Sequence, residues 1–136
     1  MAKTGKPLML VAVDESDHSF YALEWTLEYF FHTGSDHQFQ LIIVHAQSTP
    51  TAIVGGVAGP GSVEFISILE ADLKRSSIRT VEKAKELCKS ISGISVGVEI
   101  MEGDARNVLR EAVEKHNASI LVLGSHAYGA VKRAVL

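Results

Sequence analysis

The sequence predicts an α/β fold in which helices cover both faces of a parallel sheet. Short runs that are apolar at nearly every position recur along the chain, as expected of strands that are buried on both faces. Segments with apolar residues at helical spacing lie between these runs. Such regular alternation of strands and helices is typical of parallel sheets with right-handed crossovers.

The first part of the chain predicts two strands and the helix between them. Leu8 to Val13 is an apolar run, and Phe39 to Ala46 contains the next one. Ser16 or Asp17 can cap the helix, because a short side-chain oxygen accepts hydrogen bonds from the free N–H groups of a first turn. Residues 33–36 are expected to end it. The apolar stripe of this helix consists of Phe20, Leu23, Leu27, Phe30 and Phe31.

A loop rich in glycine and proline, residues 47–61, precedes a long helix. Ser62 can cap this helix, which is predicted to extend to about residue 91. Ser76 and Ser77 interrupt its apolar stripe, so the helix is expected to bend or break there. The stripe consists of Ile66, Leu69, Leu73, Val81, Ala84, Cys88 and Ile91.

The last part of the chain repeats the alternation. Residues 94–101 predict a third strand, and Asp104 is placed to cap the helix at residues 105–117. A fourth apolar run, residues 119–123, ends at Gly124. We expect one domain over residues 1–136, because this length suffices for one core and is too short for two.

Composition narrows the functional classes. The formal net charge is -3 and no basic run stands out, which argues against nucleic acid as a main partner. No segment approaches the roughly 20 apolar residues of a membrane span, and no signal peptide is recognisable. The single cysteine, Cys88, excludes an internal disulfide and lies on a helix stripe, where a core role is expected. We expect a soluble domain in the cytoplasm, with the nucleus as the alternative.

A candidate ligand site follows from topology. Ligands of open parallel sheets bind beyond the carboxyl ends of the strands, where the strand order reverses. If the sheet winds outward from the first strand in both directions, Asp14 and Gly124 face each other across one crevice. Asp14 can accept a hydrogen bond from a sugar hydroxyl or an amino group, or it can simply begin the capping segment of the helix. Residues 124–129 can present N–H groups to a phosphate, or they can form an ordinary turn.

Motifs for enzymatic chemistry are not found in the sequence. It contains neither a P-loop nor a dinucleotide fingerprint, and no nucleophile elbow. The six histidines lack the spacing of metal ligands. His45 and His116 fit structural roles, whereas His126 lies in the candidate loop.

Several segments together resemble the universal stress protein family, and its plant single-domain branch in particular. The resemblance implies a Rossmann-like sheet of strand order 3-2-1-4, followed by a fifth strand in the family. It also implies a homodimer and, in many members, bound ATP or AMP, with Mg²⁺ as a companion of the nucleotide. The segments are Val11–Ser16, Val44–Ala46, Gly103–Ala105, Leu121–His126 and Tyr128–Leu136.

The resemblance also implies a nucleotide site. ATP-binding members carry G-x2-G-x9-G-[ST] after the fourth strand; Gly124 matches the first glycine, Ala127 stands at the second, and the other two positions fall after Leu136. The methyl group of Ala127 is expected to crowd the phosphates. By resemblance, Asp14 contacts ribose or adenine, alanines line the adenine pocket, and the loop meets the phosphates. The full set is Ala12, Val13, Asp14, Ala46, Leu123, Gly124, Ser125, His126 and Ala127.

Family members continue through a further helix and the fifth strand, which commonly builds the dimer contact. The sequence therefore predicts a domain without these two elements, in which the strand at residues 119–123 has an apolar edge. The expected explanations are a truncated product, an omitted tail, or an edge that another chain covers.

Three functional hypotheses remain. The first is a stress-response regulator that binds an adenine nucleotide, with phosphate binding weakened at Ala127. The second is a signalling or interaction protein that dimerises without a nucleotide, which the incomplete motif favours. Slow ATP hydrolysis has the least support, because only Asp14 offers a general base or a metal carboxylate. No catalytic residue and no metal ligand is assigned.

Overall fold

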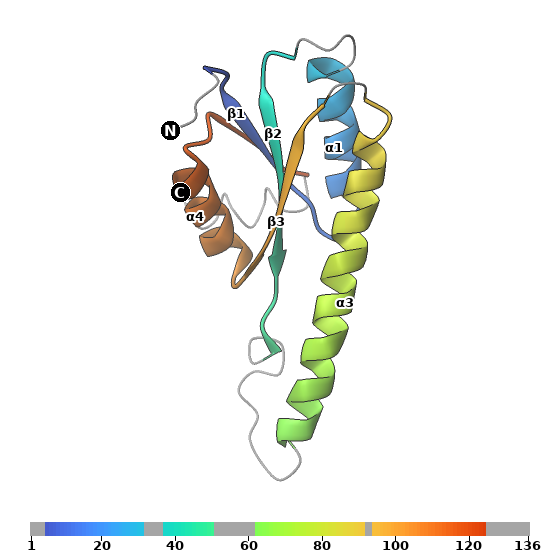
Figure 1. Ribbon diagram of the computed structural model, residues 1–136. Helices are drawn as coiled ribbons and strands as arrows, with labels where there is room; N and C mark the ends of the chain where they lie inside the picture. The colour runs from blue at the N-terminus through green and yellow to red at the C-terminus, as the bar shows by residue number, and fades with distance from the viewer. Residues whose placement is uncertain (1–4, 32–36, 51–61, 92–93, 125–136) are drawn as a thin grey trace.

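The structure is a computed structural model that describes residues 5–31, 37–50, 62–91 and 94–124. Within these residues the strands form one parallel sheet of order β3-β2-β1-β4 (Figure 1). The predicted fold class and the predicted order of these strands are therefore confirmed. The strands are β1 (Leu8–Ala12), β2 (Gln40–Gln47), β3 (Val96–Glu102) and β4 (Ile120–Val122), and the helices are α1 (Asp17–Phe30), α3 (Ser62–Cys88) and α4 (Ala105–His116).

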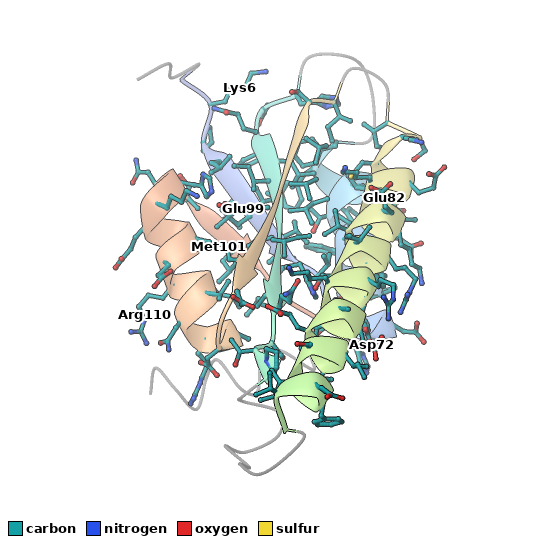
Figure 2. All side chains as sticks on the ribbon, turned by 60° about the horizontal axis from the view of Figure 1, so that its bottom comes forward. Lys6, Asp72, Glu82, Glu99, Met101 and Arg110 are labelled. Atoms are coloured by element: carbon teal, nitrogen blue, oxygen red, sulfur yellow. The ribbon has the colours of Figure 1, made fainter. Side chains whose placement is uncertain are left out.

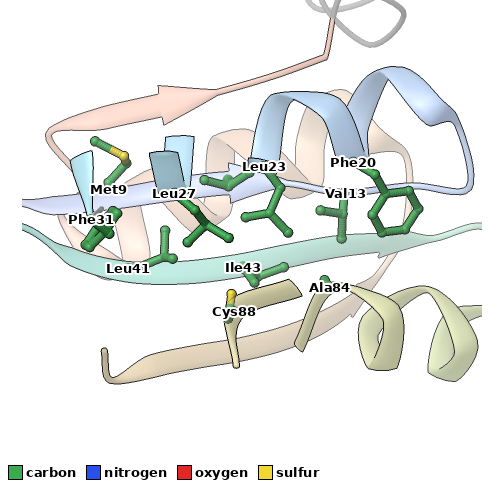
Figure 3. Packing of buried hydrophobic residues seen from close by; sticks show 11 residues of the cluster. Met9, Val13, Phe20, Leu23, Leu27, Phe31, Leu41, Ile43, Ala84 and Cys88 are labelled. Carbon is green, nitrogen blue, oxygen red and sulfur yellow. The ribbon is translucent and has the colours of Figure 1, made fainter. Parts of the chain in front are cut away.

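Helices α1 and α3 cover one face of the sheet and α4 covers the other (Figure 1). Successive side chains of a strand point to opposite faces, so β1 contributes to two separate cores. Met9 and Val11 pack with residues of α1 and α3 (Figure 3), whereas Leu10 packs with Val108 and Leu109 of α4. This burial on both sides explains why the strand is apolar at every position.

Helix α1 begins at the predicted cap. The Ser16 side chain accepts a hydrogen bond from the Ser19 amide at 3.3 Å. The expected stripe is buried except at Phe30, the last residue of the helix, which is partly exposed. The Phe30 ring instead packs edge-on against Trp25 and Phe39 at the rim of the core, with ring centroids 5.8 and 5.6 Å away. The prediction that Phe30 belongs to the buried stripe is wrong, and the expected stop at residues 33–36 lies outside the described residues.

Helix α3 continues through Ser76 and Ser77, so the predicted break does not occur. Ser77 is buried, with 2% of its surface exposed, and its hydroxyl has a hydrogen-bond partner on the sheet. A polar contact thus fills the gap in the apolar stripe. The half of α3 that follows these serines packs on the sheet, whereas the first half extends past it (Figure 1). Helix α3 begins at Ser62, whose side chain, and with it the predicted cap, is outside the described part.

Helix α4 also begins at its predicted cap. The Asp104 carboxylate accepts hydrogen bonds from the Asn107 amide at 3.4 Å and the Arg106 guanidinium at 3.1 Å. The Arg106 contact lowers the pKa of Asp104. Met101 of β3 lies toward α4, while Arg110 points away from the sheet (Figure 2).

At the end of α4, a lysine and a histidine meet a carboxylate of the neighbouring strand. Lys115 pairs with Glu99 of β3, and the Nε2 atom of His116 lies 2.7 Å from the same carboxylate. Lys115 and then His116 lower the pKa of Glu99. His116 therefore has the structural role that its place on the helix predicted.

Cys88 lies in the core beneath β2, with 4% of its surface exposed (Figure 3). Burial raises the pKa of its thiol from 9.0 to about 11. The predicted core position is confirmed. A thiol that stays protonated is a poor nucleophile, because the thiolate is the reactive form.

We expect Cys88 to react with iodoacetamide in mildly alkaline solution only as fast as the chain unfolds. Because the folded-state pKa is raised, the folded state favours the protonated thiol; this contribution to stability is complete below pH 9.0 and declines toward pH 11. Alkylation followed by mass spectrometry across a urea series checks this. The fully unfolded chain is the control, and native-state alkylation at that same rate would contradict the assignment.

Candidate functional site

A cleft of about 390 Å³ opens at the carboxyl ends of β1 and β2, beside the middle of α3. This is the end of the sheet at which parallel α/β folds bind their ligands, and the volume lies within the range of about 300–1,000 Å³ usual for small-molecule sites. The cleft includes Asp14, where the topology predicted a site. Its described lining consists of Asp14, Glu15, Ser16, His45, Ala46, Gln47, Ser48, Leu73, Ser76 and Ser77.

His45 joins three elements at the wall of the cleft. Its Nδ1 atom lies 2.8 Å from the carbonyl oxygen of Val13, and its Nε2 atom lies 3.1 Å from the Ser77 hydroxyl. A carbonyl oxygen can only accept, so Nδ1 carries the proton, and in the neutral imidazole Nε2 accepts from Ser77. With 7% of His45 exposed, both bonds are shielded from water. The imidazole therefore ties the ends of β1 and β2 to α3.

Asp14 organises the connection from β1 to α1. Its Oδ1 atom accepts hydrogen bonds from the Ser16 amide at 2.8 Å and the Ser16 hydroxyl at 2.5 Å. The Asp14 amide donates to the Ser19 hydroxyl at 3.0 Å, closing the turn onto the first turn of the helix. Asp14 is also one of the residues that line the cleft. The two roles considered for Asp14 are thus compatible, because one oxygen shapes the turn while the residue faces the hollow.

Gly124 lies directly against the first turn of α1. A Cβ atom at this position would lie 2.7 Å from the carbonyl carbon of His18 and 2.8 Å from the nitrogen of Ser19. Such distances to backbone atoms exclude a side chain without movement of the helix. Packing therefore requires glycine here, independently of any phosphate.

The predicted nucleotide-binding residues separate into groups. Asp14 and Ala46 line the cleft. Ala12 and Leu123 pack against the core on the α4 side, and Val13 lies in the core on the other side. Gly124 contacts α1 and is not among the residues that line the cleft. Ser125, His126 and Ala127 lie outside the described residues, as does the glycine-rich stretch 51–61.

The family model of the universal stress protein family matches residues 8–136. The chain belongs to the universal stress protein family. Its members are stress-response proteins, and the resemblance seen in the sequence is confirmed. Among curated proteins, none matches the chain.

Solved structures of universal stress proteins share the fold. A family member from Burkholderia pseudomallei has a TM-score of 0.72 at 22% identity, covering 97% of this chain and 92% of its own. UspA from Lactobacillus plantarum has a TM-score of 0.69 at 16% identity, covering 89% and 78%. A member from Arabidopsis thaliana with AMP bound has a TM-score of 0.64 at 23% identity, covering 93% and 81%.

The part of the cleft that sequence reasoning missed comes from α3 and from the polar end of β2. Ser76 and Ser77 interrupt the stripe of α3 because they line the cleft. Gln47, the last residue of β2, and Ser48 after it also line the cleft. Two serines in the apolar stripe of a helix, together with a histidine at the polar end of a strand, were the sequence features that could have indicated this part of the cleft.

Over the described ranges, no three His, Cys, Asp or Glu side chains converge as metal ligands would. In the same part of the chain, none of the helices has both the length and the apolar character needed to cross a bilayer.

We expect Ser77→Ala to lower the free energy of unfolding by about 1–3 kcal/mol, because Nε2 of the buried His45 would lose its donor. Urea unfolding followed by circular dichroism measures this. Ser76→Ala is the matched control, since it removes the neighbouring hydroxyl on the same helix. Equal effects of the two substitutions would refute the assigned role of the Ser77 hydroxyl.

We expect Gly124→Ala to destabilise the fold by about 1–3 kcal/mol, because the new methyl group would overlap the backbone of α1. Gly97→Ala is the control: its Cβ would lie 3.2 Å from Cγ1 of Ile42, a side-chain atom that can shift. Thermal unfolding of both variants checks the difference. If Gly124→Ala left the stability unchanged, the backbone at position 124 would not lie as close to α1 as the structure shows.

Proposed function

We propose that this universal stress protein is a stress-response regulator whose cleft binds an adenine nucleotide. The carrying observation is the hollow at the carboxyl ends of β1 and β2 with Asp14 and Ala46 in its wall. The family match supports the proposal, as does the AMP bound to the Arabidopsis thaliana member. Its role would be binding in the cytoplasm as a homodimer, rather than turnover.

The described lining suits adenosine. The carboxylate of Asp14 is a hydrogen-bond acceptor, the kind of group to which ribose hydroxyls donate. The short side chain of Ala46 leaves room for a flat base, and Leu73 of α3 adds an apolar side chain to the lining. The hydroxyls of Ser48 and Ser76 can donate to or accept from the polar atoms of a ligand.

Charge favours the nucleoside part over the phosphates. The described lining contains two acids, Asp14 and Glu15, and neither lysine nor arginine. Phosphate oxygens near these acids would be repelled unless another group compensates. We propose that residues 124–127 and Mg²⁺ meet the phosphates of ATP, while AMP depends chiefly on its base and ribose.

We expect Asp14→Ala to weaken AMP binding by about tenfold or more, because a hydrogen bond to a charged group contributes about 1.5–3 kcal/mol. Calorimetric titration measures the affinity, and unfolding curves show whether the turn survives. Glu15→Gln is the control, since it removes the adjacent lining charge. We further expect Ala127→Gly to strengthen binding of ATP with Mg²⁺ more than binding of AMP.

Absence of heat with AMP and with ATP, for both the parent chain and Ala127→Gly, would rule out the nucleotide proposal. The second candidate, a dimerising interaction protein without a nucleotide, would then take its place. One observation favours this candidate. In the described sheet β4 is an edge strand, and Ile120 on it is partly exposed, so a second chain could cover this edge. Sedimentation equilibrium with and without AMP separates the two, because only the first candidate responds to the nucleotide.

A further inference from the structure

The outer side of α1 carries an aromatic ridge, which we define as Tyr21, Trp25 and Tyr29. Their exposed fractions are 69%, 43% and 60%. A spacing of four residues places all three on one side of the helix, over a length of about 12 Å. Trp25 and Tyr29 contact each other, with ring centroids 5.4 Å apart. Trp25 and Tyr29 therefore form a continuous aromatic surface, and Tyr21 lies one turn before them on the same side of the helix.

Packing of the fold does not account for this ridge. The opposite side of α1 already supplies the buried contacts, through residues such as Leu23 and Leu27 (Figure 3). Single exposed apolar residues are common, but a contiguous group marks a site of interaction. Tyrosine and tryptophan are also the residue types that are enriched in protein interfaces and in their energetic centres.

Acidic residues flank the ridge. Asp17, Glu24 and Glu28 are exposed, and at 3.6 residues per turn they project beside the aromatic rings. The sequence of α1 contains neither lysine nor arginine. Within the described part of the chain, no ion pair joins these three acids to a base. The ridge thus combines aromatic faces with uncompensated negative charge.

The neighbouring helix does not compensate this charge. Lys83 of α3 comes close to α1, but its ammonium group lies over the Phe20 ring, 4.3 Å from the ring centre. Phe20 belongs to the buried side of the helix. The ammonium group of Lys83 therefore contributes to the packing of α3 against the buried side of α1, and it does not neutralise the acids on the outer side of α1.

We propose that the aromatic ridge docks a basic amphipathic helix of another protein. Guanidinium groups stack on tryptophan and tyrosine faces and pair with carboxylates, so arginine satisfies both features of this surface. Residues three or four apart on a partner helix match the spacing of the ridge. A second copy of α1 is a poor occupant, because it would bring three more acids against the first three. This surface is separate from the cleft and does not depend on the proposed nucleotide.

The chain provides its own reporter, since Trp25 is its single tryptophan. The probe is a synthetic helical peptide with arginine and leucine on adjoining faces, and the matched probe has glutamate in place of each arginine. We expect the arginine peptide to shift Trp25 emission to shorter wavelength and to protect it from acrylamide, with an affinity that falls as salt rises. We expect no change with the glutamate peptide.

Two variants connect the response to the ridge. Glu24→Gln with Glu28→Gln should weaken binding of the arginine peptide about two- to thirtyfold, the range that two exposed ion pairs give. Glu111→Gln with Glu114→Gln, on α4, should leave the affinity unchanged. Calorimetry of Trp25→Ala should show at least about tenfold weaker binding if this ring is a central contact.

Three results would overturn the proposal. The first is an absent or equal response to the two peptides, and the second is equal weakening by the α1 and α4 variants. The third is burial of Trp25 that depends only on protein concentration, because a second copy would then be the occupant. Circular dichroism of each variant confirms that the helices are intact.

Discussion

The bridge from Val13 through His45 to Ser77 is the constraint on which the rest of the site depends. One imidazole donates to a carbonyl group of the connection after β1 and accepts from a hydroxyl group on α3, while its own backbone belongs to β2. These elements are far apart in the sequence, so a buried pair of hydrogen bonds fixes their relative position. The long helix can then extend past the sheet and still form one wall of the cleft.

The opposite side of the site is fixed by close packing. Gly124 lets the end of β4 approach the backbone of the first turn of α1. That first turn is in turn held by Ser16 and by the carboxylate of Asp14. Residues that a binding motif would assign to a ligand therefore also have necessary roles in the fold. Substitutions here need an unfolding measurement beside every binding measurement, because the two effects share the same atoms.

Much of the fold could be predicted from the sequence, because its signals are local. Leu10 is buried on one face of the sheet while Met9 and Val11 are buried on the other, so the strand appears as a continuous apolar run. The caps at Ser16 and Asp104 are equally local, since each bonds to an amide three residues later. Asp14 was found as a site candidate because it follows a strand directly.

The remainder could not be predicted, because it depends on contacts between distant residues. The partner of Ser77 is 32 positions away, so the periodicity of one helix cannot show that this serine is satisfied by a histidine. The break expected there was therefore wrong. The prediction that Phe30 is buried was wrong for a related reason. The helix ends at this residue, and its ring packs against Trp25 and Phe39 at the rim of the core.

The charges of the described residues distinguish the two proposed binding surfaces, the cleft before α1 and the aromatic ridge along it. Just before the helix begins, Asp14 and Glu15 line the cleft and the described lining contains neither lysine nor arginine, so the proposed nucleotide would depend on shape and hydrogen bonds. Along its outer side, the acids lie next to aromatic faces, where a cation gains from both at once. The buried side of the same helix belongs to the core and faces neither surface. Because Tyr21, Trp25 and Tyr29 do not line the cleft, the proposed partner and the proposed nucleotide would use different parts of the surface.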